Sequence, residues 1–162
     1  MEKMKVLIVS DTHGRHAGIE AAIEREYPFQ KLIHLGDAEG YEEYIEELAK
    51  CPIEIVAGNN DFFSNLPDEK IIFIEDFCAM ITHGHAYGVS MGYQNIRNEG
   101  RVRGVDAVMF GHTHRPFFLQ KDGMTILNPG SLSFPRQEGR RGSYMIMEVD
   151  VDGKLSFEQK YL

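Results

Sequence analysis

Hydrophobic residues in the first two-thirds of the chain gather in short runs, and each run leads into polar residues that can bind a metal. The runs cover residues 6–9, 32–35, 53–57, 79–81 and 107–110. The segments after them are Asp11-Thr12-His13, Gly36-Asp37, Gly58-Asn59-Asn60-Asp61, His83-Gly84-His85 and Gly111-His112-Thr113-His114. Buried strands of α/β proteins have such continuous apolar runs, and their sheets bind ligands at the carboxyl ends of strands. Any one segment would also suit an ordinary turn, but five in the same position favour a shared metal site.

Between the first runs, apolar residues recur at the spacing of amphipathic helices. This spacing predicts a helix over residues 17–26, which Pro28 ends, and a second helix over residues 41–48. A third helix is expected over residues 93–102, although Gly100 interrupts its pattern. Strands that alternate with helices indicate an α/β fold.

The rest of the chain reads as strands joined by tight turns. Three hairpins are expected, and they pair residues 70–74 with 77–82, 117–121 with 124–127, and 144–149 with 155–161. The second hairpin turns at Asp122-Gly123, a dipeptide typical of type I′ turns. A parallel core followed by antiparallel hairpins implies two sheets, each with its outer face covered.

Length and charge narrow the function further. The 162 residues are expected to form a single domain, residues 1–162, and the net charge of −8 argues against a nucleic-acid or membrane-surface partner. Cys51 and Cys78 lie away from the metal-binding segments and are expected to be inert buried thiols, which suits a reducing compartment. The sequence has neither a signal-peptide pattern nor an apolar stretch of about 20 residues. A cytoplasmic protein is therefore expected.

The candidate ligands favour two ions over one. Residues at i and i+2 of extended backbone face the same side, so Asp11 with His13, and His112 with His114, can each reach one cation. Imidazole, carboxylate and amide donors without a thiolate suit Mn²⁺, Fe²⁺, Zn²⁺, Co²⁺ or Ni²⁺. Six or seven ligands exceed the four that tetrahedral zinc takes, and they suit two ions that share a carboxylate.

The five segments resemble the motifs of the calcineurin-like metallophosphoesterase superfamily. The short chain, His83-Gly84-His85 and the later Asn128-Pro129-Gly130-Ser131 resemble its small bacterial and archaeal phosphodiesterase branch. The resemblance implies a four-layer α-β-β-α sandwich of two mixed sheets. By the family pattern, one ion, expected to be Mn²⁺, is held by Asp11, His13, Asp37 and His114. Asp37 then bridges to a second ion, held also by Asn59, His83 and His112.

A dinuclear metal-dependent phosphodiesterase is therefore expected, in which a metal-bridging hydroxide attacks a small phosphate diester in line. Two alternatives stay open. One is a phosphomonoesterase, and the other is a non-catalytic protein-interaction scaffold on the same fold, like the retromer subunit. That subunit departs from the pattern at several ligand positions, whereas every position is filled here. The sequence leaves open whether the chain forms a homo-oligomer.

Two residues are candidates for a direct part in catalysis. Catalytic members of the superfamily carry histidine where this chain has Asn60, and an amide delivers no proton at neutral pH. His85 is a candidate substitute for that acid, or it hydrogen-bonds to a metal ligand.

Further residues have weaker predictions. His34 is expected to be a packed core residue or part of the site, and Asp61 to orient a neighbouring loop. Arg136 is a candidate for binding a substrate phosphate, Arg115 is as readily explained as a solvated side chain, and His16 is expected to be exposed at a helix start.

Overall fold

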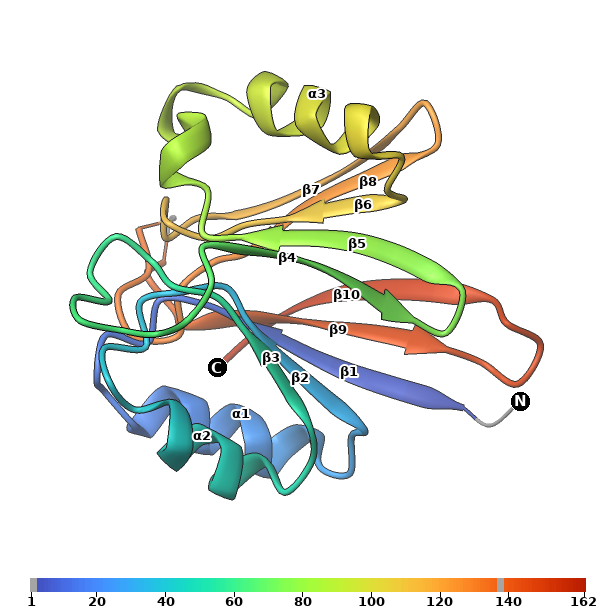
Figure 1. Ribbon diagram of the computed structural model, residues 1–162. Helices are drawn as coiled ribbons and strands as arrows, with labels where there is room; N and C mark the ends of the chain where they lie inside the picture. Colours follow the sequence, from blue (N-terminus) through green and yellow to red (C-terminus); the bar gives the residue numbers. More distant parts are fainter. Residues whose placement is uncertain (1–2, 137–138) are drawn as a thin grey trace.

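The computed structural model describes residues 3–136 and 139–162 (Figure 1). Over these residues the elements are β1 (Met4–Val9), α1 (Ala17–Glu26), β2 (Lys31–His34), α2 (Glu42–Ala49), β3 (Ile53–Ile55), β4 (Glu69–Ile74), β5 (Phe77–Thr82), the short 3-10 helices η1 (His85–Tyr87) and η2 (Val89–Met91), α3 (Gln94–Arg103), β6 (Ala107–Met109), β7 (Pro116–Lys121), β8 (Met124–Pro129), β9 (Ser143–Val149) and β10 (Leu155–Tyr161).

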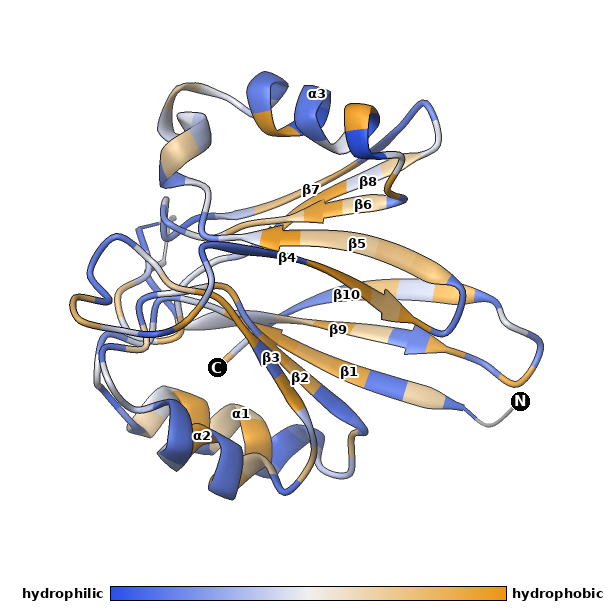
Figure 2. Ribbon diagram, in the orientation of Figure 1, coloured by the Kyte–Doolittle hydropathy of each residue, from blue (hydrophilic) through white to orange (hydrophobic). Residues whose placement is uncertain are grey.

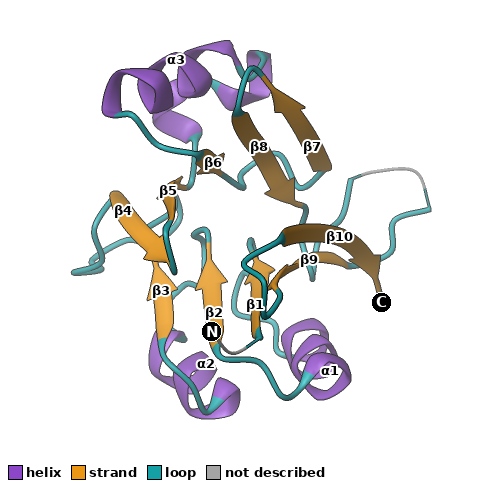
Figure 3. Ribbon diagram, turned by 90° about the vertical axis from the view of Figure 1, so that its right-hand side faces the viewer, coloured by secondary structure: helices purple, strands orange, loops and turns teal. Residues whose placement is uncertain are grey.

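Two mixed sheets pack face to face. One has the strand order β10-β9-β1-β2-β3 and the other β4-β5-β6-β8-β7. Helices α1 and α2 cover the outer face of the first sheet, and α3 covers the outer face of the second, as the turned view shows (Figure 3). The predicted four-layer α-β-β-α sandwich is therefore confirmed.

The continuous apolar runs arise because the central strands are buried on both faces. In β1, Val6 and Ile8 join the core between the two sheets, whereas Leu7 and Val9 pack in the layer with α1 and α2. All four side chains are fully buried. Figure 2 shows this apolar character along β1 and β5 and the polar outer faces of the helices.

The second sheet repeats this division. Ala79 and Ile81 of β5 face the shared core, and Met80 packs with Val108 and with Ile96 of α3. Successive side chains of a strand point to opposite faces of the sheet, so neighbouring residues pack in different apolar layers. The strand residues that face away from the shared core therefore form the apolar surface on which the helices pack.

The predicted elements are confirmed, but the sheets divide the strands in an unexpected way. The five apolar runs belong to two sheets, three in the first and two in the second. Strand β8 lies between β6 and β7 and pairs parallel to β6. Asp122 and Gly123 have φ of 52° and 78°, the positive values that a type I′ turn requires.

The two sheets nonetheless deliver their strand ends to one side of the molecule, at the left in Figure 1. The Asp11 N–H donates to the Gly36 carbonyl at 3.0 Å, and the His13 N–H to the Asp37 carbonyl at 2.9 Å. In the second sheet the Gly111 N–H donates to the His83 carbonyl at 3.0 Å. These bonds hold the loops after β1 and β2 together, and likewise those after β5 and β6.

Two smaller expectations need correction. Cys51 and Cys78 are half-buried rather than buried, because they lie at the edges of two apolar layers, and burial raises the pKa of both thiols. His16 is half-buried too, because its ring stacks on Tyr44 with centroids 4.2 Å apart. No helix in the described part of the chain is long and apolar enough to cross a membrane.

Candidate metal centre

Five loops bring the predicted ligands together at the junction of the two sheets. They follow β1, β2, β3, β5 and β6 and carry, in that order, Asp11 with His13, Asp37, Asn59, His83, and His112 with His114. All seven predicted ligands therefore meet at one place in the fold.

Asp11 is the centre of the first group of donors. Its Oδ1 lies 3.2 Å from His114 Nε2, 3.6 Å from His13 Nε2 and 3.7 Å from His83 Nε2. The Nε2 atoms of His13 and His114 are 3.1 Å apart. The side chain of Asp11 is fully buried, so water does not solvate these charges.

Asp37 joins this group to the second one. Its Oδ2 is 3.3 Å from His83 Nε2 and 3.6 Å from His13 Nε2. His112 Nδ1 then lies 3.3 Å from His83 Nε2 and 3.2 Å from Asn59 Oδ1. The Asp37 carboxylate thus lies between the two sets of donors, where a bridging ligand is expected.

These separations suit divalent ions. Two nitrogen or oxygen ligands that are ~2.1 Å from one ion lie ~3.0–3.4 Å apart at angles of ~90–110°. Among the described residues, the buried Asp11 Oδ1 has no hydrogen-bond partner. A buried charge without a partner is costly, and a cation offsets that cost. The donor set therefore fits a metal centre.

Backbone hydrogen bonds fix which imidazole nitrogen faces the centre. His83 Nδ1–H donates to the Leu35 carbonyl at 2.7 Å, and His114 Nδ1–H donates to the Phe134 carbonyl at 2.7 Å. A carbonyl only accepts, so each Nδ1 carries a proton and each Nε2 faces the carboxylates, where it can bind an ion once it is unprotonated. Metal-binding histidines are commonly oriented in this way.

The loop backbone is strained at the ligands and very close to them. Five predicted ligands have a positive φ between 49° and 73°, an unusual region for side-chain-bearing residues that clusters at functional sites: Asp11, His13, Asp37, His112 and His114. A Cβ on Gly58 would lie 2.1 Å from Asp37 Oδ1, and one on Gly111 would lie 2.6 Å from Asp11 Oδ2. Glycine is required here because the backbone approaches the carboxylates directly.

The carboxylates stay ionised despite their burial. For Asp11, burial opposes ionisation, but the nearby His114 and His13 imidazoles outweigh it and hold the pKa well below its usual range. The pKa of Asp37 is lowered in the same way, with burial outweighed by its contact with His83. Asp11 conversely raises the pKa of His13, and for His83 burial opposes protonation but Asp37 and Asp11 outweigh it and raise the pKa. The centre has the negative charge that a cation requires.

Asp61 orients the neighbouring loops, as the sequence predicted. Its Oδ2 accepts the N–H of Asp37 at 2.8 Å and of Gly58 at 2.6 Å, and its Oδ1 accepts the N–H of Glu39 at 2.7 Å. One carboxylate therefore ties the loop after β2 to the loop after β3.

His34 is a core residue that also supports the site. It is fully buried, and burial lowers its pKa to about 4, so the ring is neutral. Its Nδ1 accepts the Gly36 N–H at 3.1 Å, which leaves Nε2 as the donor to Thr12 Oγ1 at 3.0 Å. His34 thus holds the loops that carry Asp11 and Asp37.

The two candidate catalytic residues differ in their contacts. Asn60 donates its side-chain N–H to Asp37 Oδ2 at 3.0 Å and its backbone N–H to Asp37 Oδ1 at 2.9 Å. His85 is exposed at the rim, 5.5 Å from the His83 ring between centroids. Within residues 3–136 and 139–162, its ring has no hydrogen-bond partner. Burial and the charge of His83 lower its pKa.

Some supporting residues carry no sequence signal of their own. Ser10 Oγ donates to Asp11 Oδ2 at 2.5 Å, and Ser131 Oγ donates to the Asp11 carbonyl at 2.7 Å. Ser131 ends the Asn-Pro-Gly-Ser turn, which the resemblance associated with the branch, whereas Ser10 is only the residue before a ligand. Glu39 Oε2 lies 3.3 Å from His13 Nδ1, although Glu39 belongs to no motif.

A hollow of about 620 Å³ opens directly onto the first group of ligands. His13 and His114 line it together with Arg15, Glu39 and Arg136. Arg136 is exposed and lines this opening, where a phosphate-binding residue is expected, and Arg15 is a second arginine that the sequence did not single out. Arg115 is exposed and lines a neighbouring hollow instead.

Comparisons with known proteins agree with this geometry. Residues 4–152 match the model of the calcineurin-like phosphoesterase superfamily domain. The chain is 32% identical over 150 residues to the probable metallophosphoesterase YsnB of Bacillus subtilis, covering 92% of this chain and 86% of that protein. It is 32% identical over 146 residues to phosphodiesterase MJ0936 of Methanocaldococcus jannaschii, covering 78% and 83%. Its structure is similar to a single mutant of Vps29 from Entamoeba histolytica, with a TM-score of 0.79 and 25% identity over 98% of this chain and 99% of that one.

Proposed function

The chain belongs to the calcineurin-like phosphoesterase superfamily, and from that premise we propose that it is a single-domain phosphodiesterase that works with two divalent ions, with Mn²⁺ as the first candidate. One observation carries the proposal. The buried Asp11 Oδ1 has no hydrogen-bond partner in the described part of the chain, and three imidazole nitrogens lie 3.2, 3.6 and 3.7 Å away. Such a convergence of donors on an ionised carboxylate is useful only to a cation.

Each ligand has a role in this proposal. Asp11, His13, Asp37 and His114 hold one ion, and Asn59, His83 and His112 hold the second, with Asp37 shared. Ions held there would supply Lewis-acid stabilisation of phosphoryl charge and an acidified water as nucleophile.

The rim of the site favours a singly charged substrate. Arg136 and Arg15 border the opening and are positioned to bind a phosphoryl oxygen. Glu39 lies at the same opening and repels negative charge. A monoester carries a second negative charge that a diester lacks, and Asn60 offers no cationic imidazole to balance it. These charges support a diester over the phosphomonoesterase alternative.

Departure of the leaving group is not helped by a protonated side chain in this proposal. Asn60 uses its side-chain N–H on Asp37. The lowered pKa of His85 keeps its ring neutral at pH ~7, so it can hydrogen-bond to a substrate oxygen but holds no excess proton. The leaving oxygen therefore departs as an anion, or with help from the ions and solvent.

The scaffold alternative is supported by the similarity to Vps29 alone. The complete ligand set supports the enzyme, because strained backbone clusters at functional sites and Asp11 Oδ1 has no hydrogen-bond partner among the described residues. Hydrolytic activity separates the scaffold alternative from the proposed enzyme, since a scaffold hydrolyses neither diesters nor monoesters.

The test is hydrolysis by Mn²⁺-loaded protein of bis(p-nitrophenyl) phosphate and of p-nitrophenyl phosphate. We expect kcat/KM to be about 10-fold or more higher for the diester. Across a series of diesters, log kcat/KM should fall steeply with leaving-group pKa, because general-acid assistance of ~10²–10⁴-fold is missing. The His85→Gln variant should keep this slope. A shallow slope that steepens in His85→Gln would assign the acid to His85, and equal inactivity on all esters would favour the scaffold.

A further inference from the structure

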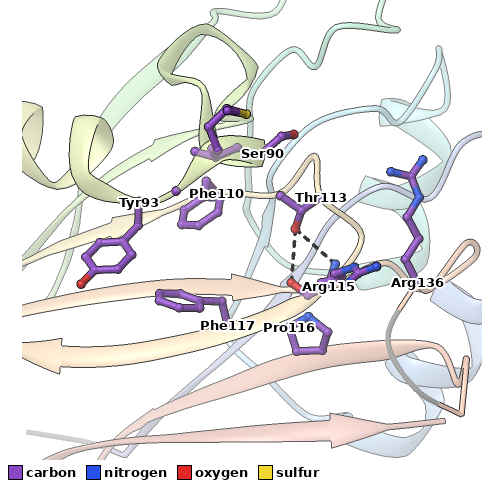
Figure 4. A pocket seen from close by; sticks show the side chains of 11 residues that line it. Ser90, Tyr93, Phe110, Thr113, Arg115, Pro116, Phe117 and Arg136 are labelled. Atoms are coloured by element: carbon purple, nitrogen blue, oxygen red, sulfur yellow. Dashed lines mark hydrogen bonds between the residues drawn. The ribbon is translucent and has the colours of Figure 1, made fainter.

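A second hollow, of about 610 Å³, lies beside the metal centre. Figure 4 shows three aromatic rings on one side of it, Tyr93, Phe110 and Phe117, and the side chains of Thr113, Arg115 and Arg136 on the other. Its volume is in the range of pockets that take small organic ligands, and its mixture of apolar walls with a few polar groups is typical of them.

This hollow adjoins the opening over the candidate ligands, with which it shares one lining residue. Arg136 lines both hollows, and Thr113 stands in the chain between the ligands His112 and His114. The Asn128 side-chain N–H groups donate to Thr113 Oγ1 at 2.9 Å and to the Gly111 carbonyl at 3.0 Å. The polar wall of the hollow is therefore fixed to the loop that carries two metal ligands.

The aromatic wall is preorganised by contacts among its own rings. Tyr93 and Phe117 have centroids 5.4 Å apart at 32°, and Phe110 and Phe117 have centroids 6.5 Å apart at 41°. Phe110 is almost fully buried, whereas Tyr93 and Phe117 are half-buried and so offer ring surface to a ligand. Rings of this kind stack on flat groups with little loss of side-chain freedom.

We propose that this hollow binds a planar aromatic substituent of the phosphodiester, with its phosphate near Arg136 and the ions. The inference rests on the proposed function and names its substrate class: an aryl or nucleoside-type diester with a single ring system at this position. Stacking on Tyr93 and Phe117 favours a flat ring over an alkyl chain, and the exposed Arg115 guanidinium adds a second planar group. One hollow for one ring fits a small diester and not a polymer.

The test uses monoesters as probes, since each carries one substituent only. Methyl, n-hexyl and phenyl phosphate and thymidine 5′-monophosphate are titrated into Mn²⁺-loaded protein by calorimetry, and assayed as inhibitors of bis(p-nitrophenyl) phosphate hydrolysis. Phenyl phosphate and thymidine 5′-monophosphate should bind about 10-fold or more tightly than methyl phosphate, the size expected of ring stacking. The ratio should approach one in Tyr93→Ala and Phe117→Ala.

Phe118→Ala is the matched control, because this neighbour of Phe117 faces the other side of the sheet and packs on Phe157 at 5.5 Å. It should keep the wild-type ratio. The ratio is measured within one protein, so a partly unfolded variant lowers both affinities and leaves the comparison valid. Equal binding of methyl and phenyl phosphate, n-hexyl phosphate binding as tightly as phenyl phosphate, or an unchanged ratio in both pocket variants would each overturn the proposal. Ring preference without any hydrolysis would support the pocket and reject the proposed function.

Discussion

Two groups of buried charge in this molecule differ in how they are satisfied. Glu26 on α1 is 3% exposed, and its carboxylate accepts the Tyr144 hydroxyl at 2.6 Å and pairs with Lys5 at 3.0 Å and Lys160 at 3.1 Å. The protein itself supplies every partner. This group needs nothing from outside, and its role is to join α1 to β1, β9 and β10.

The metal centre is built in the opposite way. Asp11 is as buried as Glu26, yet its Oδ1 has no hydrogen-bond partner among the described residues, and its nearest imidazole nitrogen belongs to His114, whose ring is held by a hydrogen bond to the Phe134 carbonyl. The comparison teaches that burial alone does not mark a functional carboxylate. What distinguishes the site is that Asp11 Oδ1 has no hydrogen-bond partner among the described residues, while His83 and His114 beside it are held by hydrogen bonds to backbone carbonyls.

The largest expected effect comes from removing Asp37, the ligand that we propose the two ions share. In Asp37→Ala each ion loses a donor, so we expect kcat/KM on the diester to fall by ~10³-fold or more and both metal affinities to fall. Elemental analysis after Mn²⁺ loading should give about two ions per wild-type chain and fewer in the variant. Without metal, the variant should be less stable than the wild type, since the hydrogen bonds from Asn60 and the contact with His83 are lost and their partner groups are left without the carboxylate.

Glu26→Gln serves as the control for that experiment, because it alters a buried carboxylate far from the ions. Its metal content and kcat/KM should equal those of the wild type. One ion in the wild type, with no loss in Asp37→Ala, would show that Asp37 is not a bridge.

Local signals explain how much of the fold was predictable. The helix at residues 17–26 has an apolar period of 3.6, and the turn at Asp122-Gly123 has residues that accept positive φ, so both follow from neighbouring residues. The parallel pairing of β8 with β6 joins strands on either side of β7 in the sequence, and no local pattern specifies it. The division of the apolar runs between two sheets is missed for the same reason.

The candidate site was predictable where a sequence motif contains side chains that can bind a metal ion. The seven candidate ligands are recognisable because each lies in a loop that follows a strand, whereas the Asn60 contact with Asp37 depends on side-chain directions that spacing does not reveal. The group around Glu26 has no signal at all, since Lys5, Tyr144 and Lys160 come from three different strands. Sequence patterns therefore predict donors for an external ion better than they predict a closed internal network.

Asp61 sharpens the comparison, because it sits in the metal centre but is satisfied like Glu26. Its three accepted N–H bonds fix the loops of Asp37 and Asn59 without offering an oxygen to an ion. In Asp61→Asn an amide N–H faces backbone donors, so the loops should shift. We expect metal affinity to fall ~10–100-fold while the count stays at about two ions per chain.

The matched control is Asp68→Asn, which changes an exposed carboxylate further along the same loop. Metal affinity in that variant should equal that of the wild type. A loss of one whole ion in Asp61→Asn would instead make Asp61 a ligand, and it would contradict the distinction between satisfied and unsatisfied carboxylates.

The smallest expected effect concerns how the ionised group around Glu26 contributes to stability at different pH values. Burial opposes ionisation of Glu26, but hydrogen bonds from Tyr144, Lys5 and Lys160 outweigh it and lower the pKa below the ordinary 4.5. A carboxyl with a lowered pKa in the folded state stabilises the protein above its unfolded pKa, and this contribution is lost as the pH falls through the folded pKa.

Glu26→Gln removes the charge, and because both lysines are partly exposed to solvent, we expect a loss of only about 1–2 kcal/mol in the free energy of unfolding at pH ~7. The difference between the two metal-free proteins should shrink toward zero as the pH is lowered from ~5 to ~3, which urea denaturation at several pH values measures. A difference that stays constant over this range would mean that Glu26 contributes through packing and not through its charge.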